Sequence, residues 1–238
     1  MSLYRDEGVV LRTLRLGEAD RIVTLLTKGR GKVRAVAKGV RRTNSKFGAR
    51  LEPLSHVAML CWQGRELDIV NQVEVIDAFR AVREDLDRVA KGFTLLEVTD
   101  QLSQERHPTP RLYDMLVGAL RTLADGDEAL LVPGFLLKAL ALDGSSPVVD
   151  RCVTCGVTEG LVAFDLVEGG VLCRSCRRGR SVSPEAIDIL RHILGGGLAE
   201  ALRMPAGPVT DEVGTLSTEA MEVHLDRRLR SVHASPTG

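Results

Sequence analysis

Two Cys-x-x-Cys pairs constrain the fold of this 238-residue chain more than any other feature of its sequence. Seventeen residues separate Cys155 from Cys173. Each pair is expected to turn its two sulfurs toward one point, and a hairpin between the pairs completes a tetrahedron. Gly156 follows the second cysteine, where a tight turn favours a residue without a Cβ atom. The pattern predicts one structural zinc ion, Zn2+, with four ligands: Cys152, Cys155, Cys173 and Cys176.

Two other interpretations of these cysteines stay open, namely a pair of disulfides and a redox dithiol. A reducing compartment argues against disulfides, and a redox motif needs only one pair, at a strand-to-helix junction that this region does not show. Four sulfurs around one ion leave no position for water, so we expect the metal to hold structure rather than to catalyse. Cys61 is expected to be a buried apolar residue and not a fifth ligand.

The compartment is predicted from what the sequence lacks. No stretch approaches the roughly 20 apolar residues of a membrane span. Arg5, Asp6 and Glu7 stand where a signal peptide has its apolar region. We therefore expect a cytoplasmic protein with no membrane partner.

Residues 1–79 predict a small antiparallel barrel. Five short alternating runs, broken by glycines and charged turns, lie between Glu7 and Phe79, as expected for a closed or half-closed barrel. The segment KVRAVAK has the period of two that separates the faces of a strand. Its basic face is predicted to be exposed, and it carries Lys32, Arg34 and Lys38 beside Val36, opposite Val33, Ala35 and Ala37.

The period changes to that of helices after Phe79. Residues 80–148 and 182–238 are predicted to form a helical domain, with residues 149–181 as a zinc-binding insertion. Pro133 is placed in the first turn of an apolar central helix, or else kinks it. Ser183 is predicted to cap a later helix, with Pro184 in its first position. Two buried stripes are predicted: Val82, Leu86, Val89, Phe93 and Leu96, then Leu112, Leu116, Ala119 and Leu123.

The charge of the chain is unevenly distributed, although its formal net charge is zero. Residues 1–50 contain thirteen Lys or Arg and four Asp or Glu, a balance of +9, whereas residues 81–238 contain seventeen and twenty-three, a balance of −6. Such asymmetry indicates contact with a polyanion.

The excess of positive charge is concentrated between Thr27 and Arg50, where there is no acidic residue. A solvated loop is the simplest interpretation, but the run spans a strand pair as well as a loop, so its charges are expected to converge on one surface. Because no counter-charge lies within the run, an outside anion would relieve their repulsion, and nucleic-acid phosphate is such an anion. The predicted contacts are Lys28, Arg30, Lys32, Arg34, Lys38, Arg41, Arg42, Lys46 and Arg50.

Aromatic residues make up only 3% of the chain, which favours contacts to the phosphate backbone over stacking of bases. Phe47 is the one ring within the basic run. Trp62, on a neighbouring strand, is predicted to be core rather than a stacking platform. Such a surface suits single strands and duplex alike.

No catalytic constellation is recognisable, and we do not expect an enzyme. The segment GRGK lacks the spacing of a phosphate loop, and Val33 stands where Ser or Thr would bind magnesium. The five histidines are scattered without paired spacing. Glu18 and Asp20 lie near a turn, and a lone pair of this kind is only weak support for a nuclease.

The segments GEADRIVTLLTKGRGKVRAVAKGVRR, FGARLEPLSHV and CVTCG…LCRSC occur in this order along the chain. With them, the chain closely resembles the bacterial RecO family of recombination mediators and strand-annealing proteins over nearly its whole length. The likeness is most specific in GKVRAVAKGVRR, in RLEPLSHV and in the cysteine segment.

The resemblance implies an α+β multidomain fold, with an N-terminal OB-fold β-barrel, an α-helical bundle domain and an inserted four-cysteine zinc finger. It implies a nucleoid-associated protein that acts in DNA repair and homologous recombination in response to DNA damage. Such a protein binds ssDNA and dsDNA, anneals strands coated by single-strand binding protein, and works with RecR, and often RecF, to load RecA. It also binds the C-terminal tail of single-strand binding protein. The resemblance carries DNA contact over to Lys38, Arg41, Arg42, Lys46 and Arg50.

One alternative of another class stays open: a zinc-stapled scaffold whose basic face docks an acidic protein. The sequence also leaves open whether the finger touches DNA through its own arginines. These are Arg174, Arg177, Arg178 and Arg180.

Overall fold

A computed structural model describes residues 2–43, 45 and 47–233 of the chain. It contains two compact units, Met1–Asp125 and Gly126–Gly238. Three helices therefore belong to the same unit as the N-terminal strands. The finer division into three domains that the sequence indicates stays a prediction.

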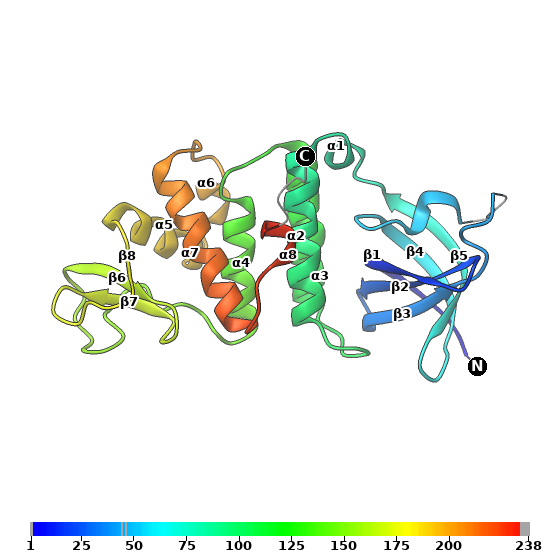
Figure 1. The fold of residues 1–238 in the computed structure, drawn as a ribbon, viewed down its shortest axis with the longest axis horizontal. Helices are drawn as coiled ribbons and strands as arrows, with labels where there is room; N and C mark the ends of the chain where they lie inside the picture. Colours follow the sequence, from blue (N-terminus) through cyan, green and yellow to red (C-terminus); the bar gives the residue numbers. More distant parts are fainter. Residues whose placement is uncertain (1, 44, 46, 234–238) are drawn as a thin grey trace. The chain divides into compact units, whose positions relative to one another are not determined.

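The first unit contains the predicted barrel (Figure 1). Its strands close in the order β1-β2-β3-β5-β4, and β3 and β5 pair in parallel while all other neighbours are antiparallel. This is an OB-like barrel, as expected. A 3-10 helix, η1 (Gly48–Leu51), connects β3 to β4. The strands are β1 (Leu3–Leu16), β2 (Asp20–Thr27), β3 (Gly31–Ala37), β4 (His56–Trp62) and β5 (Asp68–Asp77).

Strand β3 alternates as its sequence predicts. Val33, Ala35 and Ala37 are buried in the barrel core, and Lys32 and Arg34 point to the other face. That other face is partly covered, however, because the segment that follows helix α2 (Leu86–Leu102) lies against it. The backbone N–H of Lys32 donates to the carbonyl of Gln104 at 3.3 Å.

Three helices complete the first unit: α1 (Arg80–Arg83), α2 (Leu86–Leu102) and α3 (Pro110–Asp125). The stripe predicted for α2 was wrong at two positions, since Leu86 and Phe93 are 87% and 41% exposed. The helix begins only after its N-cap Asp85, and it buries the face around Gly92 instead. A Cβ atom at Gly92 would lie 2.9 Å from the Leu54 side chain, so a larger residue here would have to displace Leu54.

The stripe predicted for α3 is confirmed. Helix α3 packs against α2, and all four positions of its predicted stripe are buried. They are Leu112, Leu116, Ala119 and Leu123.

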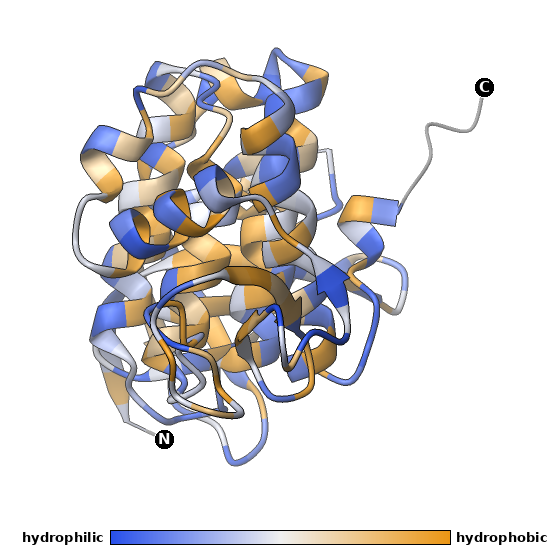
Figure 2. Cartoon of the chain, turned by 90° about the vertical axis from the view of Figure 1, so that its left-hand side faces the viewer, coloured by the Kyte–Doolittle hydropathy of each residue, from blue (hydrophilic) through white to orange (hydrophobic). Residues whose placement is uncertain are grey.

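The second unit is built on α4 (Leu131–Leu142), which packs against α7 (Pro208–His224) and α5 (Pro184–Leu194). Pro133 lies in the first turn of α4, where its missing N–H costs no hydrogen bond. The Ser183 hydroxyl caps α5 by accepting from the Ala186 N–H, as predicted. Figure 2 shows hydrophobic and hydrophilic residues alternating along the helices. The unit also contains two short helices, α6 (Leu198–Ala201) between α5 and α7, and α8 (Arg230–His233) after α7.

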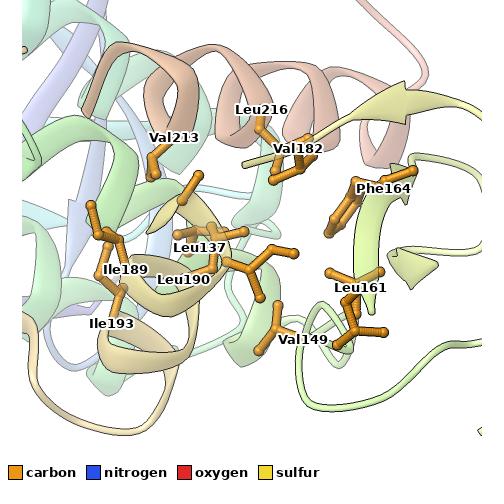
Figure 3. Close-up of a cluster of buried hydrophobic side chains, with 14 of the residues drawn as sticks. Leu137, Val149, Leu161, Phe164, Val182, Ile189, Leu190, Ile193, Val213 and Leu216 are labelled. Carbon is orange, nitrogen blue, oxygen red and sulfur yellow. The ribbon is translucent and has the colours of Figure 1, made fainter. Parts of the chain in front are cut away.

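A three-stranded sheet lies between α4 and α5 in sequence, in the order β7-β6-β8. Its strands are β6 (Leu161–Asp165), β7 (Gly170–Cys173) and β8 (Arg180–Ser181). Phe164 of β6 and Val182 share one hydrophobic cluster with Leu137, Leu190 and Leu216 of the helices (Figure 3). The cysteine segment and the helices of this unit are therefore stabilised by one core.

Within the described part of the chain, no helix combines the length and hydrophobicity needed to cross a membrane.

Candidate metal centre and nucleic-acid interface

The four predicted ligands come together in the second unit. The sulfur atoms of Cys152, Cys155, Cys173 and Cys176 all lie within 4.8 Å of one another. The Sγ atoms of Cys155 and Cys173 are 3.7 Å apart. The four thiols are thus positioned to bind a single metal ion.

Backbone hydrogen bonds shape both turns. The Gly156 N–H donates to the Cys152 carbonyl at 2.8 Å, and Gly156 has a φ of +80°, which a residue with a Cβ atom rarely adopts. In the second turn, the Cys176 N–H donates to the Cys173 carbonyl at 3.2 Å. The Arg174 N–H donates to the Gly160 carbonyl at 3.1 Å, which ties the second turn to the start of β6.

The environment of Cys152 favours the thiolate that a metal requires. Burial of the sulfur opposes ionisation, but backbone N–H groups at Cys173, Cys155 and Thr154 outweigh it and lower the pKa of the Cys152 thiol to about 6, while the neighbouring sulfurs raise the pKa of the Cys155 and Cys176 thiols. By contrast, burial raises the pKa of the Cys61 thiol to about 12. Cys61 lies in the barrel core, fully buried, as the sequence predicts.

The finger arginines divide into two kinds. Arg178 donates to Asp165 at 2.6 Å, and Arg180 forms an ion pair of 2.5 Å with Glu219 on α7. Arg177 donates to the Ser181 hydroxyl, whereas Arg174 is exposed beside a shallow hollow that Glu159 also lines. Two of the four charges are therefore neutralised within the unit itself.

The basic run of the barrel divides in the same way. No acid lies within the run itself, but distant segments supply carboxylates to three of its cations. Lys28 pairs with Glu7 of β1 at 3.0 Å. On β3, Lys32 lies 3.2 Å from Asp100 of α2, and Arg34 lies 3.4 Å from Glu105.

Arg30 is occupied differently, since its guanidinium lies 3.9 Å from the centroid of the Tyr4 ring. Arg50 is exposed on η1. Lys46 lies outside the described residues.

Three predicted contacts remain exposed at the end of β3, namely Lys38, Arg41 and Arg42. Among the described residues, no carboxylate lies within salt-bridge distance of any of them. Arg41 ties this loop to the β1–β2 turn, because its N–H donates to the Ala19 carbonyl at 3.0 Å and its guanidinium donates to the Glu18 carbonyl at 2.9 Å.

The β1–β2 hairpin adds a cation that sequence reasoning missed. Arg15 is exposed two residues before Gly17, in the turn to which Arg41 is bonded. Its opposite partner across the ladder is Arg21, which is itself paired with Glu52. Arg15 lies outside the basic run in sequence, and the link to it is made by the hydrogen bonds of Arg41 to the hairpin turn that follows Arg15. We call this group of cations the hairpin-end surface: Arg15, Lys38, Arg41 and Arg42.

Two acids of the same turn have structural roles. The Asp20 carboxylate accepts from the Gly39 N–H at 2.7 Å, so it fixes the loop that carries the cations. In the described residues, the cysteine cluster is the only group of three or more potential metal ligands, and neither Glu18 nor Asp20 belongs to it.

The prediction that Trp62 belongs to the core was wrong, since this side chain is 39% exposed. It lies at the end of β4 on the outer face of the barrel, and the side chain before it, Cys61, points inward. The alternation of the strand explains this, because the register of β4 assigns the inward positions to Val57, Met59 and Cys61.

Comparison with known proteins agrees with this architecture. The family model described as "Recombination protein O N terminal" matches residues 1–79, and that described as "Recombination protein O C terminal" matches residues 83–233. A protein of Frankia casuarinae, named DNA repair protein RecO, is 44% identical over 239 residues, which cover 98% of each chain. The chain therefore belongs to the RecO family of DNA repair proteins.

Proposed function

We propose that this protein binds single- and double-stranded DNA through the hairpin-end surface and anneals complementary strands. The observation that carries the proposal is the position of Lys38, Arg41 and Arg42, exposed and without a carboxylate partner among the described residues, on an OB-like barrel. A cation that already pairs with a carboxylate gains little free energy by binding a phosphate, because it must be desolvated and its own pair must be broken. Phosphates therefore bind best to cations that have no carboxylate partner.

Annealing follows from charge screening. Two complementary strands repel each other through their phosphates, and a cationic surface that screens both lowers the barrier to pairing. Contacts to phosphate carry no sequence information and leave base edges free to pair. No bond is made or broken, so the proposed role needs no catalytic residue.

In this proposal the protein works with RecR, and with RecF where it is present, to load RecA on strands coated by single-strand binding protein. The C-terminal tail of single-strand binding protein is the proposed contact that brings it there. Membership of the RecO family supports these partners, and the cytoplasm, at the nucleoid, is the proposed location.

We further propose that the metal held by the four cysteines is zinc. Four sulfurs around zinc, each at about 2.3 Å, lie roughly 3.8 Å apart in a regular tetrahedron. The 3.7 Å between Cys155 and Cys173 fits this spacing. An all-thiolate shell selects a soft or borderline ion. Because the four sulfurs leave no open coordination position, the ion has only a structural role.

Two triple variants test the DNA surface. The first removes the free charges with Lys38→Gln, Arg41→Gln and Arg42→Gln. The matched control removes one lysine and two arginines that already have partners, with Lys28→Gln, Arg30→Gln and Arg34→Gln. Binding of a fluorescent single-stranded oligonucleotide is measured by anisotropy at several salt concentrations, and annealing is measured in parallel.

We expect the first variant to lose affinity and annealing, and its log-log salt slope to fall by about 2, from roughly 0.7 per phosphate contact. The control is expected to change both much less. Equal binding by the first variant and the wild type would overturn the proposal. Two ligands of one surface must compete. If an acidic protein binds the hairpin-end surface without displacing a bound oligonucleotide, the DNA lies elsewhere and the assignment is wrong.

A further inference from the structure

The outer face of the barrel carries an apolar row across three strands. Leu3 of β1 lies opposite Trp62 of β4, and Trp62 lies opposite Ile69 of β5. Leu3 and Trp62 are 45% and 39% exposed, and Ile69 is half-buried. Directly opposite side chains on one face of a sheet are about 5 Å apart at Cβ, so these three form one continuous surface.

This surface is rigid. Trp62 lies on the middle strand of the three, and its backbone is paired on both sides. The start of β1 is tied to the end of β4, because the Gln63 N–H donates to the Ser2 carbonyl at 2.8 Å and the Ser2 hydroxyl donates to the Gln63 side chain at 3.0 Å. A backbone held in this way needs little further ordering when the side chains that it carries bind a ligand.

Charged groups of both signs lie around the row. Arg5 follows Leu3 on the same face of β1, and it lines a groove with Leu60 and Gln72. Arg65 is exposed in the loop that directly follows β4, and Arg106 reaches the same loop by donating to the Gly64 carbonyl at 3.0 Å. Acids lie among these cations. Glu66 is exposed next to Arg65, Asp6 and Glu74 line the groove, and Arg106 also contacts Asp68 at 3.3 Å. Glu7, at the far end of the groove, pairs with Lys28.

An aromatic ring flanked by guanidinium groups has the chemistry of a single-stranded nucleic-acid site, in which a base stacks on the ring and phosphates meet the cations. A protein partner fits less well, because three apolar side chains fall far short of the roughly 20–30 residues a side of a stable interface. We infer that Trp62 is a stacking platform for an unpaired base of a bound strand, with Leu3 and Ile69 as its apolar borders.

This inference rests on the proposed DNA binding and adds a preference for single strands. In a duplex the bases are stacked within the helix and do not reach Trp62, whereas a single strand offers both its phosphates and its bases. The hairpin-end surface then supplies affinity for phosphate, and Trp62 distinguishes unpaired strands from paired ones.

Trp62 is the only tryptophan of the chain, so its fluorescence reports on this position alone. Three probes of equal length are titrated into the full-length protein: oligo-dT, an oligonucleotide of abasic sites, and a duplex. We expect quenching with oligo-dT and little with the other two. Equal quenching by all three would show that the ring does not contact bases and would overturn the inference.

Anisotropy with two variants gives the energetic test. Trp62→Leu is expected to weaken binding of oligo-dT about fivefold to tenfold, at the lower end of the effect of losing one stacked base, and to leave duplex binding unchanged. Trp62→Phe keeps a ring and is expected to stay within about twofold of the wild type. The abasic probe is expected to bind wild type and Trp62→Leu equally, since it has no base to stack.

The outcomes separate this inference from the proposed function. If Trp62→Leu binds oligo-dT as tightly as the wild type, the platform is wrong while the hairpin-end surface stands. If loss of Lys38, Arg41 and Arg42 has no effect but Trp62→Leu weakens binding, the hairpin-end surface is wrong while the platform stands. Emission that changes with protein concentration alone, without DNA, would identify the row as a contact between copies of this chain.

Discussion

The Lys32 ammonium group lies 3.2 Å from the Asp100 carboxylate, and the same carboxylate accepts from Arg12 at 2.6 Å, although 68 residues separate Lys32 from Asp100. The Lys32 and Asp100 side chains are only 15% and 11% exposed. This pair therefore fastens α2 to the outer face of the barrel, and it removes Lys32 from the cations that are free to meet an anion.

We predict that Asp100→Ala destabilises the first unit, because it leaves two cations without a carboxylate in a largely buried place. Breaking a buried pair costs about 3–5 kcal/mol, and the partial exposure of Arg12 brings our expectation to about 2–3 kcal/mol. Denaturant unfolding measures this free energy. The control is Glu105→Ala, whose pair with Arg34 is exposed and is expected to contribute less than about 1 kcal/mol. Equal losses in both variants would contradict the structural role of Asp100.

Replacing a cysteine ligand should release the metal. We expect Cys155→Ser and Cys173→Ser to purify with much less than one zinc per chain, measured by elemental analysis, and to unfold at lower temperature. Cys61→Ala is the control, because Cys61 lies in the barrel core and should keep the full metal content. A Cys155→Ser variant that retains one equivalent would contradict the four-thiolate site.

The shared core of the second unit predicts that packing in α4 supports the metal centre. Leu137 is 2% exposed and belongs to the cluster that contains Cys152 and Cys173, whereas Leu142, on the same helix, is 43% exposed. Leu137→Ala should cost about 2–5 kcal/mol and speed the release of metal to a chelator. Leu142→Ala is expected to change stability by less than about 0.5 kcal/mol and to leave release unchanged. Similar release rates in the two variants would argue against a shared core.

His56 predicts a loss of stability on acidification. Its Nε2 atom lies 2.7 Å from the Tyr113 hydroxyl, and burial lowers the pKa of the imidazole below its ordinary value of 6.5. The unfolded chain therefore takes up a proton at His56 before the folded chain does, so stability is complete above about pH 6.5 and falls as the pH drops below it. Unfolding free energies between pH 8 and 5 test this.

In His56→Gln this part of the pH dependence should disappear, although the variant is less stable at neutral pH. His107→Gln is the control, because His107 is exposed in the segment between α2 and α3. An unchanged pH profile in His56→Gln would show that other groups cause the acid sensitivity.

The sequence by itself determined the elements whose signals are local. The period of two in β3, the cap at Ser183, the proline in the first turn of α4 and the cysteine spacing each depend on residues a few positions apart, and the structure has them as predicted. The closed barrel also followed from the number and spacing of its strands.

Only the tertiary structure decided which of these residues are free to act. Asp100 and Glu105 neutralise cations of β3, and hydrogen bonds of Arg41 join its loop to the hairpin turn that follows Arg15. The same strand pairing exposes Trp62, which its hydrophobicity assigned to the core. The physical reason is that ion pairing and burial depend on distance in space, and chain closure brings together charges that lie far apart in sequence.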